Sequence, residues 1–187
     1  TYEIRNVPRE FSDEGIKWLK SRLKLSTETI TLASNNASLA NQQNWHLGFI
    51  KLEEIGLNYS TTFTVPEKEG VINQSGLQQV TLTLDSEGLE EREFIVNADN
   101  VTVVNAPANY DFKVITKEVR ITVIGPPEEL DALSTTDIVL EIDLTNHNAD
   151  QMVSFSRDPV ISFNNSKHVW ASGVYKIALE RVEKTTE

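Results

Sequence analysis

The three histidines are the residues of this chain best suited to acid–base chemistry or zinc binding. His46, His147 and His168 stand far apart, and no pair has the short spacing that presents two ligands to one metal. A serine–histidine–aspartate hydrolase stays open on composition alone, although no Gly-x-Ser-x-Gly elbow is present to expose a nucleophilic serine. We interpret the histidines as surface or strand-edge residues and expect no catalytic residue.

The segment most similar to a metal site is Asn146–Asp150, whose oxygen-bearing side chains are of the kind that surrounds calcium. An EF-hand loop needs glycine at its sixth position and glutamate at its twelfth. Counted from Asn146, those positions hold Gln151 and Arg157. We therefore predict a polar hairpin loop here and no metal-ligating residue.

Carboxylates and glycines give no further site. Glu67 and Glu69, and the run Glu90, Glu91 and Glu93, stand beside turns and are typical of solvated connectors. With 28 acidic residues, the sequence does not select one pair of glycosidase carboxylates. The eight glycines form no G-x-G arrangement that could hold a phosphate. We expect no cofactor and no cofactor-binding residue.

Aromatic residues are the remaining candidates, because a row of exposed rings can bind carbohydrate. Trp18 lies on the flank of a predicted helical stripe, and the others occupy strand-like runs, where such rings are more often packed in a core. The candidates are Trp18, Trp45, Trp170, Tyr59, Tyr110 and Tyr175.

Composition excludes several classes of function. The net charge is −11 and both halves of the chain are acidic, whereas nucleic-acid binding and charge-driven membrane binding require a basic face. The absence of cysteine excludes disulfides, thiolate metal sites and cysteine nucleophiles. No apolar run reaches the length of a membrane span. We expect the chain to be a fragment whose anchor, if it has one, lies upstream.

The sequence elements that would position any functional site form one pattern that occurs twice in the chain. Each copy has an opening Asn-x-Pro motif, an alternating run, a short polar stretch that ends in leucine, and a closing strand after a glycine. In order, the matching segments are Asn6–Pro8 and Asn105–Pro107, Thr29–Leu32 and Arg120–Val123, Leu39 and Leu130, and Gly76–Leu82 and Gly173–Leu179. The repeat predicts two units, 1–88 and 92–187, each large enough for its own core.

Alternating runs rich in threonine, valine and isoleucine predict strands in antiparallel sheets. Ser12–Glu14 followed by Ile16 and Leu19 predicts a short helix over about 13–22 in the first unit. Pro126–Leu133 predicts a helical turn in the second. The predicted strands are Tyr2–Val7, Thr29–Ala33, Trp45–Glu53, Tyr59–Val65, Val80–Leu84, Glu93–Val96, Val101–Val104, Lys113–Ile115, Val119–Ile124, Ile138–Leu144, Val160–Phe163 and Tyr175–Arg181.

The second copy resembles a YbbR domain over about residues 93–182. The motifs that carry this resemblance are Asn105–Tyr110, Val119–Leu130, Ile138–Leu144 and Gly173–Leu179, in that order. The first copy is a diverged match that keeps Asn6–Pro8, Ile30–Leu32 and Gly76, with Lys51-Leu52 where the second has Asp143-Leu144. The resemblance implies two tandem, mostly β units with crossed-over antiparallel strands.

The same resemblance implies a function. YbbR repeats follow a membrane helix, lie on the outer face of the bacterial cytoplasmic membrane, and regulate a membrane diadenylate cyclase, which makes cyclic di-AMP. By this resemblance the chain is a non-catalytic, extracytoplasmic module with a protein partner and no nucleic acid, joined to the membrane only through an anchor outside these residues. The alternative is a generic adhesin-like or carbohydrate-binding β module of the bacterial surface.

Overall fold

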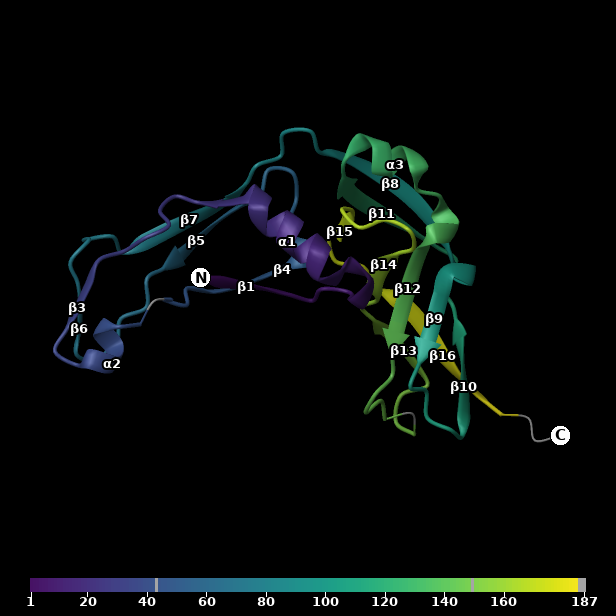
Figure 1. Ribbon diagram of the computed structural model, residues 1–187. Coiled ribbons are helices and arrows are strands. Elements are labelled where there is room, and N and C mark those ends of the chain that lie inside the picture. Colours follow the sequence, from purple (N-terminus) through teal and green to yellow (C-terminus); the bar gives the residue numbers. More distant parts are fainter. Residues whose placement is uncertain (43, 149, 185–187) are drawn as a thin grey trace.

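The computed structural model describes residues 1–42, 44–148 and 150–184 and confirms the predicted mostly β fold. Figure 1 shows a bent molecule in which one arm carries the N-terminal strands and the other carries the C-terminal strands, with α1 between them. None of the described helices is both long enough and apolar enough to cross a membrane.

Among its described residues, the first unit contains seven short strands. β1 and β4 pair in parallel, β7 lies between β2 and β5 in an antiparallel sheet, and β3 pairs with β6 alone. The strands are β1 (Tyr2–Arg5), β2 (Leu23–Leu25), β3 (Leu32–Ser34), β4 (Gly48–Lys51), β5 (Ser60–Thr64), β6 (Val71–Asn73) and β7 (Gln79–Leu84).

The part of the second unit that the structure describes contains nine strands in three sheets. β12 lies between β9 and β14, β16 between β10 and β13, and β11 between β15 and β8. The strands are β8 (Glu90–Asn97), β9 (Val101–Val104), β10 (Tyr110–Val114), β11 (Glu118–Gly125), β12 (Ile138–Asp143), β13 (Ser154–Arg157), β14 (Val160–Phe163), β15 (Trp170–Ser172) and β16 (Ile177–Glu183).

The helices are short. α1 starts within the predicted Ser12–Glu14 segment, where acidic residues favour the positive end of a helix, and it buries Leu19 on one face. α2 and α3 are the helical turns that carry Leu39 and Leu130 in the two copies. The bounds are α1 (Ser12–Arg22), α2 (Ala37–Ala40) and α3 (Pro127–Ala132), with 3₁₀ turns η1 (Arg9–Phe11), η2 (Leu52–Glu54), η3 (Ala98–Asn100) and η4 (Thr135–Asp137).

Four strand pairings occur in both units with the same direction. The parallel pair β1–β4 corresponds to β9–β12, and the antiparallel pairs β2–β7, β5–β7 and β3–β6 correspond to β10–β16, β13–β16 and β11–β15. Among the described strands, β8 and β14 have no paired counterpart in the first unit. The repeated sequence therefore encodes a repeated topology, and the second copy carries two additional strands.

The Asn-x-Pro motif has a physical role that is the same in both copies. Asn6 and Asn105 have φ angles of 58° and 53°, a left-handed conformation that asparagine tolerates better than most residues. Each side-chain amide donates a hydrogen bond to an acid at or just after the end of the parallel partner strand, Glu53 at 2.6 Å and Asp143 at 2.9 Å. The motif turns the chain sharply as it leaves the parallel strand.

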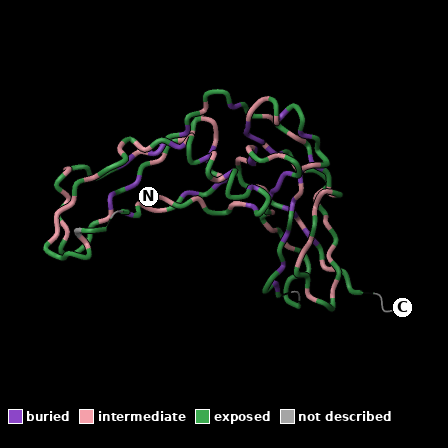
Figure 2. The backbone as a smooth tube through the Cα atoms, viewed as in Figure 1, coloured by how far each residue is buried: buried purple, intermediate pink, exposed green. Residues whose placement is uncertain are grey.

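Three apolar clusters form the core, and Figure 2 shows that buried residues are concentrated in the second unit and at the bend. The largest cluster belongs to the second unit and is built around Ile121, Leu140 and Ile177. The next is built mainly from the first unit, but it includes Ile124 and Trp170 of the second. The two units thus share one core at their junction.

Two sequence expectations need correction. Glu90, Glu91 and Glu93 are exposed, as expected, but Glu90 and Glu91 lie on strand β8, which begins three residues before the predicted strand Glu93–Val96. Arg92 continues the inward-facing alternation of Phe94 and Val96, but the charges obscured this part of the strand. The second correction concerns strand direction. Antiparallel sheets were predicted, but each unit also contains a parallel pair, β1–β4 or β9–β12, because the alternation of side chains does not reveal strand direction.

Candidate functional site

Trp170 is the centre of the junction between the two units. It lies on β15 of the second unit, is 1% exposed, and packs in the cluster formed mainly by the first unit. Its indole Nε1 donates a hydrogen bond of 2.8 Å to the main-chain oxygen of Ile55. A buried indole N–H needs such an acceptor. The position of the ring is therefore fixed both by its burial and by this hydrogen bond.

Helix α1 covers this tryptophan from the side of the first unit. Trp18 meets Trp170 edge to face with ring centroids 6.2 Å apart, and it stacks at a tilt on His168 at 4.6 Å. The guanidinium of Arg22 lies 5.1 Å from the Trp18 ring centroid, within cation–π range. Trp18, predicted to lie on the flank of the helical stripe, therefore belongs to the contact between the units.

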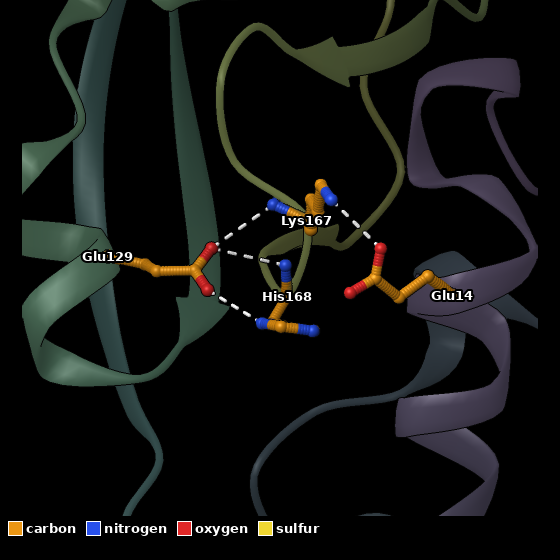
Figure 3. A network of polar contacts seen from close by, with 4 residues as sticks. All are labelled: Glu14, Glu129, Lys167 and His168. Carbon is orange, nitrogen blue, oxygen red and sulfur yellow. Dashed lines mark hydrogen bonds and ion pairs between the residues drawn. The ribbon is translucent and has the colours of Figure 1, made fainter.

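Polar contacts surround the aromatic group, and Figure 3 shows four of their side chains. Glu129 on α3 accepts hydrogen bonds of 3.1 Å from the main-chain N–H groups of Lys167 and His168, and its other oxygen lies 2.7 Å from His168 Nδ1. Lys167 Nζ reaches Glu14 on α1 at 2.9 Å. The loop before β15 is thereby held by one helix from each unit.

The Glu14–Lys167 pair links the two units through charge. The hydrogen bond between them, with their mutual attraction, lowers the pKa of the Glu14 carboxyl and raises the pKa of the Lys167 ammonium. Both side chains are largely exposed, so salt screens the attraction and it contributes little to stability. The buried indole, rather than this ion pair, dominates the junction.

Main-chain contacts bring the units still closer. A Cβ added to Gly15 on α1 would lie 2.7 Å from the carbonyl oxygen of Lys167, so only glycine fits there. The N–H of Gly173 donates a hydrogen bond of 2.8 Å to the carbonyl oxygen of Glu53 in the first unit. Glycine inside a helix is unfavourable by about 1 kcal/mol, and Gly15 was therefore the sequence signal for this close approach.

A cleft of about 500 Å³ lies at the same junction, between the Asn-x-Pro turn of the first unit and β14 of the second. Val160 and Val174 are exposed on the second-unit side, and Lys51, Glu53 and Asp158 add charge to the lining. The cleft lining includes no histidine.

The three histidines do not come together. His46 is exposed, His168 is at the junction, and His147 is buried at 8% exposure between the rings of Phe112 and Phe155. Burial, with the nearby Arg157 guanidinium, lowers the pKa of His147. His147 is thus a core residue, which corrects the expectation that it lies at the surface.

The predicted polar loop at 146–150 contains no metal site among its described residues. Asp150 accepts a hydrogen bond of 2.6 Å from the hydroxyl of Tyr110, and Ala149 lies outside the described residues. Within residues 1–42, 44–148 and 150–184, no group of three or more acidic or histidine side chains is placed to hold a metal ion.

The remaining aromatic candidates are engaged in packing. Trp45 is 8% exposed, and its Nε1 donates to the Pro66 carbonyl oxygen at 3.2 Å. The Tyr175 hydroxyl accepts a hydrogen bond from the Thr122 N–H at 2.8 Å and donates one to the Ser172 carbonyl oxygen, and Tyr59 packs against the junction core.

Comparison with known proteins gives one structural likeness. No family model matches the chain, and no curated protein matches it. Among solved structures, the chain is similar to a YbbR-like protein from Streptococcus pneumoniae TIGR4, with 11% sequence identity, a TM-score of 0.34, and coverage of 99% of this chain and 91% of that one. A YbbR-like protein is thus among the structures that this chain resembles, at a distant level.

Proposed function

We propose that this chain is a non-catalytic, extracytoplasmic module of a membrane-tethered bacterial protein, and that it regulates a membrane diadenylate cyclase by binding a protein partner. The family part of this proposal rests on the ordered YbbR-like motifs of the second copy. The remainder rests on how the side chains are used.

The single observation that carries the proposal is the Trp170 junction. It fixes two units that share four strand pairings to each other through a common buried core, and it engages Trp18, Trp170 and His168 in that contact. A body of this kind acts by presenting surfaces in a set relative orientation. Regulation then requires only that the module bind more tightly to one conformation of the cyclase than to another.

Membrane tethering would make this binding effective. A module held next to the cyclase meets it at a high effective concentration, so a weak contact suffices. The acidic net charge of −11 disfavours adsorption to anionic lipid, which leaves the surfaces of the module available for protein.

Co-purification tests the proposal directly. The chain, fused to a membrane helix, is co-expressed with the diadenylate cyclase of the same organism and captured from detergent extract. We expect the cyclase to be retained by the wild-type module and lost with Trp170→Ala, which disturbs the junction. Leu140→Ala, which deletes a fully buried side chain in the core of the second unit, serves as the control that separates junction loss from general destabilisation.

Two results would contradict the proposal. One is absence of the cyclase from the wild-type capture under conditions in which both proteins are folded. The other is specific binding of the isolated chain to glycans, which would favour the carbohydrate-binding alternative.

A further inference from the structure

At the far end of the first unit, the described residues lack a strand that the second unit has. β11 is paired on both sides, with β15 on one and β8 on the other, whereas its counterpart β3 is paired with β6 alone. β8 also contacts the turn η4. Lys51 and Asp143 occupy the same position in the two parallel pairs, and six residues before them stand Trp45 and Asp137 of η4, so Trp45 corresponds to Asp137. A strand in the β8 position of the first unit would therefore run along β3 and reach Trp45.

Burial at equivalent positions shows the effect of the missing strand. Ile121 and Val123 of β11 are 0% exposed, but their sequence counterparts Ile30 and Leu32 are only partly buried. On the neighbouring strand, Ile72 is 68% exposed. In Figure 2 this end of the molecule, at the left, is drawn mainly in the colours of exposed and intermediate residues.

A groove is open at this place. It has a volume of about 840 Å³ and opens beside the β3–β6 pair. Its lining includes Leu32 of β3, Trp45, the whole of β6 and the segment 64–69. In the second unit, β8 contributes Val96, which is 1% exposed, and the partly buried Phe94 to the core. An occupant of the groove would need the same alternation of apolar side chains.

Charge selects among possible occupants. Residues 26–44 and 64–78, which form this end of the molecule, contain the acids Glu28, Glu67 and Glu69 and the single base Lys68. The Lys68 ammonium lies 4.2 Å from the Trp45 ring centroid and bonds Gln42, so it is already engaged. The rim is therefore acidic, and it complements a basic segment while repelling a second copy of the acidic β8.

We propose that the groove beside β3 binds an extended, basic segment of a partner protein, which adds as an antiparallel strand in the place that β8 holds in the second unit. Main-chain pairing along β3 supplies affinity, and the apolar pockets at Trp45 and Leu32 supply specificity for alternate side chains. This inference rests on the proposal that the module acts by binding protein, and it locates the contact.

A peptide derived from β8 tests the inference. The probe is a fluorescent peptide copying Leu89–Ala98 with Glu90, Glu91 and Glu93 replaced by lysine, and the control peptide also has Phe94 and Val96 replaced by serine. Binding is measured by fluorescence anisotropy, and the site is located from amide chemical shifts of the isotope-labelled chain. We expect binding of the basic peptide with shifts at residues 29–34 and 71–73, and no binding of the serine control.

Charge-reversal variants provide matched controls. Glu67→Lys combined with Glu69→Lys should weaken binding about tenfold, because two favourable surface contacts become repulsive. Glu118→Lys with Glu141→Lys changes the net charge by the same amount at exposed positions of β11 and β12, and it should change affinity less than twofold.

Several outcomes would overturn the inference. The first is no binding at peptide concentrations of about 1 mM, which lies at the weak end of specific recognition. The second is equal binding of the serine peptide, and the third is an equal effect of the two charge-reversal pairs. The fourth is chemical-shift changes confined to the free edge of β8. Self-association of the chain through β3, seen as a dimer in sedimentation, would also overturn it. Failure here would leave cyclase co-purification unaffected, so the two proposals fail separately.

Discussion

Replacing Trp170 with alanine should uncouple the two units. The side chain is 1% exposed and lies in a cluster to which both units contribute. Deleting a buried tryptophan costs about 3–5 kcal/mol, through lost burial and the cavity that remains. The milder Trp170→Phe keeps a ring but leaves the Ile55 carbonyl oxygen without its indole donor, at a cost of about 1–3 kcal/mol.

Distance measurements can separate uncoupling from simple loss of stability. The chain has no cysteine, so spin labels introduced at Ile72→Cys and Val182→Cys, both on exposed strand positions far from the junction, report only the separation of the two units. We expect a narrow distance distribution in the parent and a broad one in Trp170→Ala.

Trp45→Ala is the control, because it also deletes a buried, hydrogen-bonded indole but lies wholly within the first unit. It should lower the free energy of unfolding without broadening the distribution. Equal distributions in the two tryptophan variants would refute the role assigned to Trp170.

Three further predictions concern other contacts. Gly15→Ala should destabilise the protein in thermal melts by about 1–3 kcal/mol although alanine favours helices, because its Cβ would meet the Lys167 carbonyl oxygen; a stabilised variant would contradict the close approach. Because the pKa of His147 is lowered in the folded state, the unfolded chain binds the proton first as pH falls. The free energy of unfolding should therefore decrease as pH drops below 6.5, and His147→Phe should abolish this part of the pH dependence in urea titrations. Asn105→Ala should cost about 1–2 kcal/mol through its left-handed backbone and the lost bond to Asp143, and Asn105→Gly should cost less; equal costs would show that backbone conformation is unimportant there.

The parts of the fold that were predictable are those encoded locally. The helix predicted over 13–22 is α1, because acidic first-turn residues and apolar residues at helical spacing occur together in one segment, although no side-chain hydrogen bond caps its start. The turn predicted at Pro126–Leu133 contains α3, and Lys51 and Asp143 occupy matching positions in the two parallel pairs, as the repeat required.

Other strands were missed because their signals were weak or mixed. β2, β6, β13 and β15 have only three or four residues each, too short for alternation to be recognised. The run predicted as a strand over Trp45–Glu53 instead ends in the turn η2 after a short β4.

The junction was not predictable, because it depends on which surfaces meet. Trp170 was correctly assigned to packing, but nothing near it in sequence indicates that its pocket belongs to the other unit. Lys167 and Glu14 are separated by 153 positions, and only the folded chain brings them together. Gly15 carried the one local signal, a glycine within a helix, and its significance required the neighbouring backbone to be seen.

The most direct test of the proposed function is the cellular concentration of cyclic di-AMP, measured by mass spectrometry in cells that express the cyclase with the membrane-fused module. We predict that the concentration changes when the wild-type module is present and returns to the cyclase-only value with Trp170→Ala, at equal protein levels. A concentration that is the same with and without the wild-type module would contradict the account.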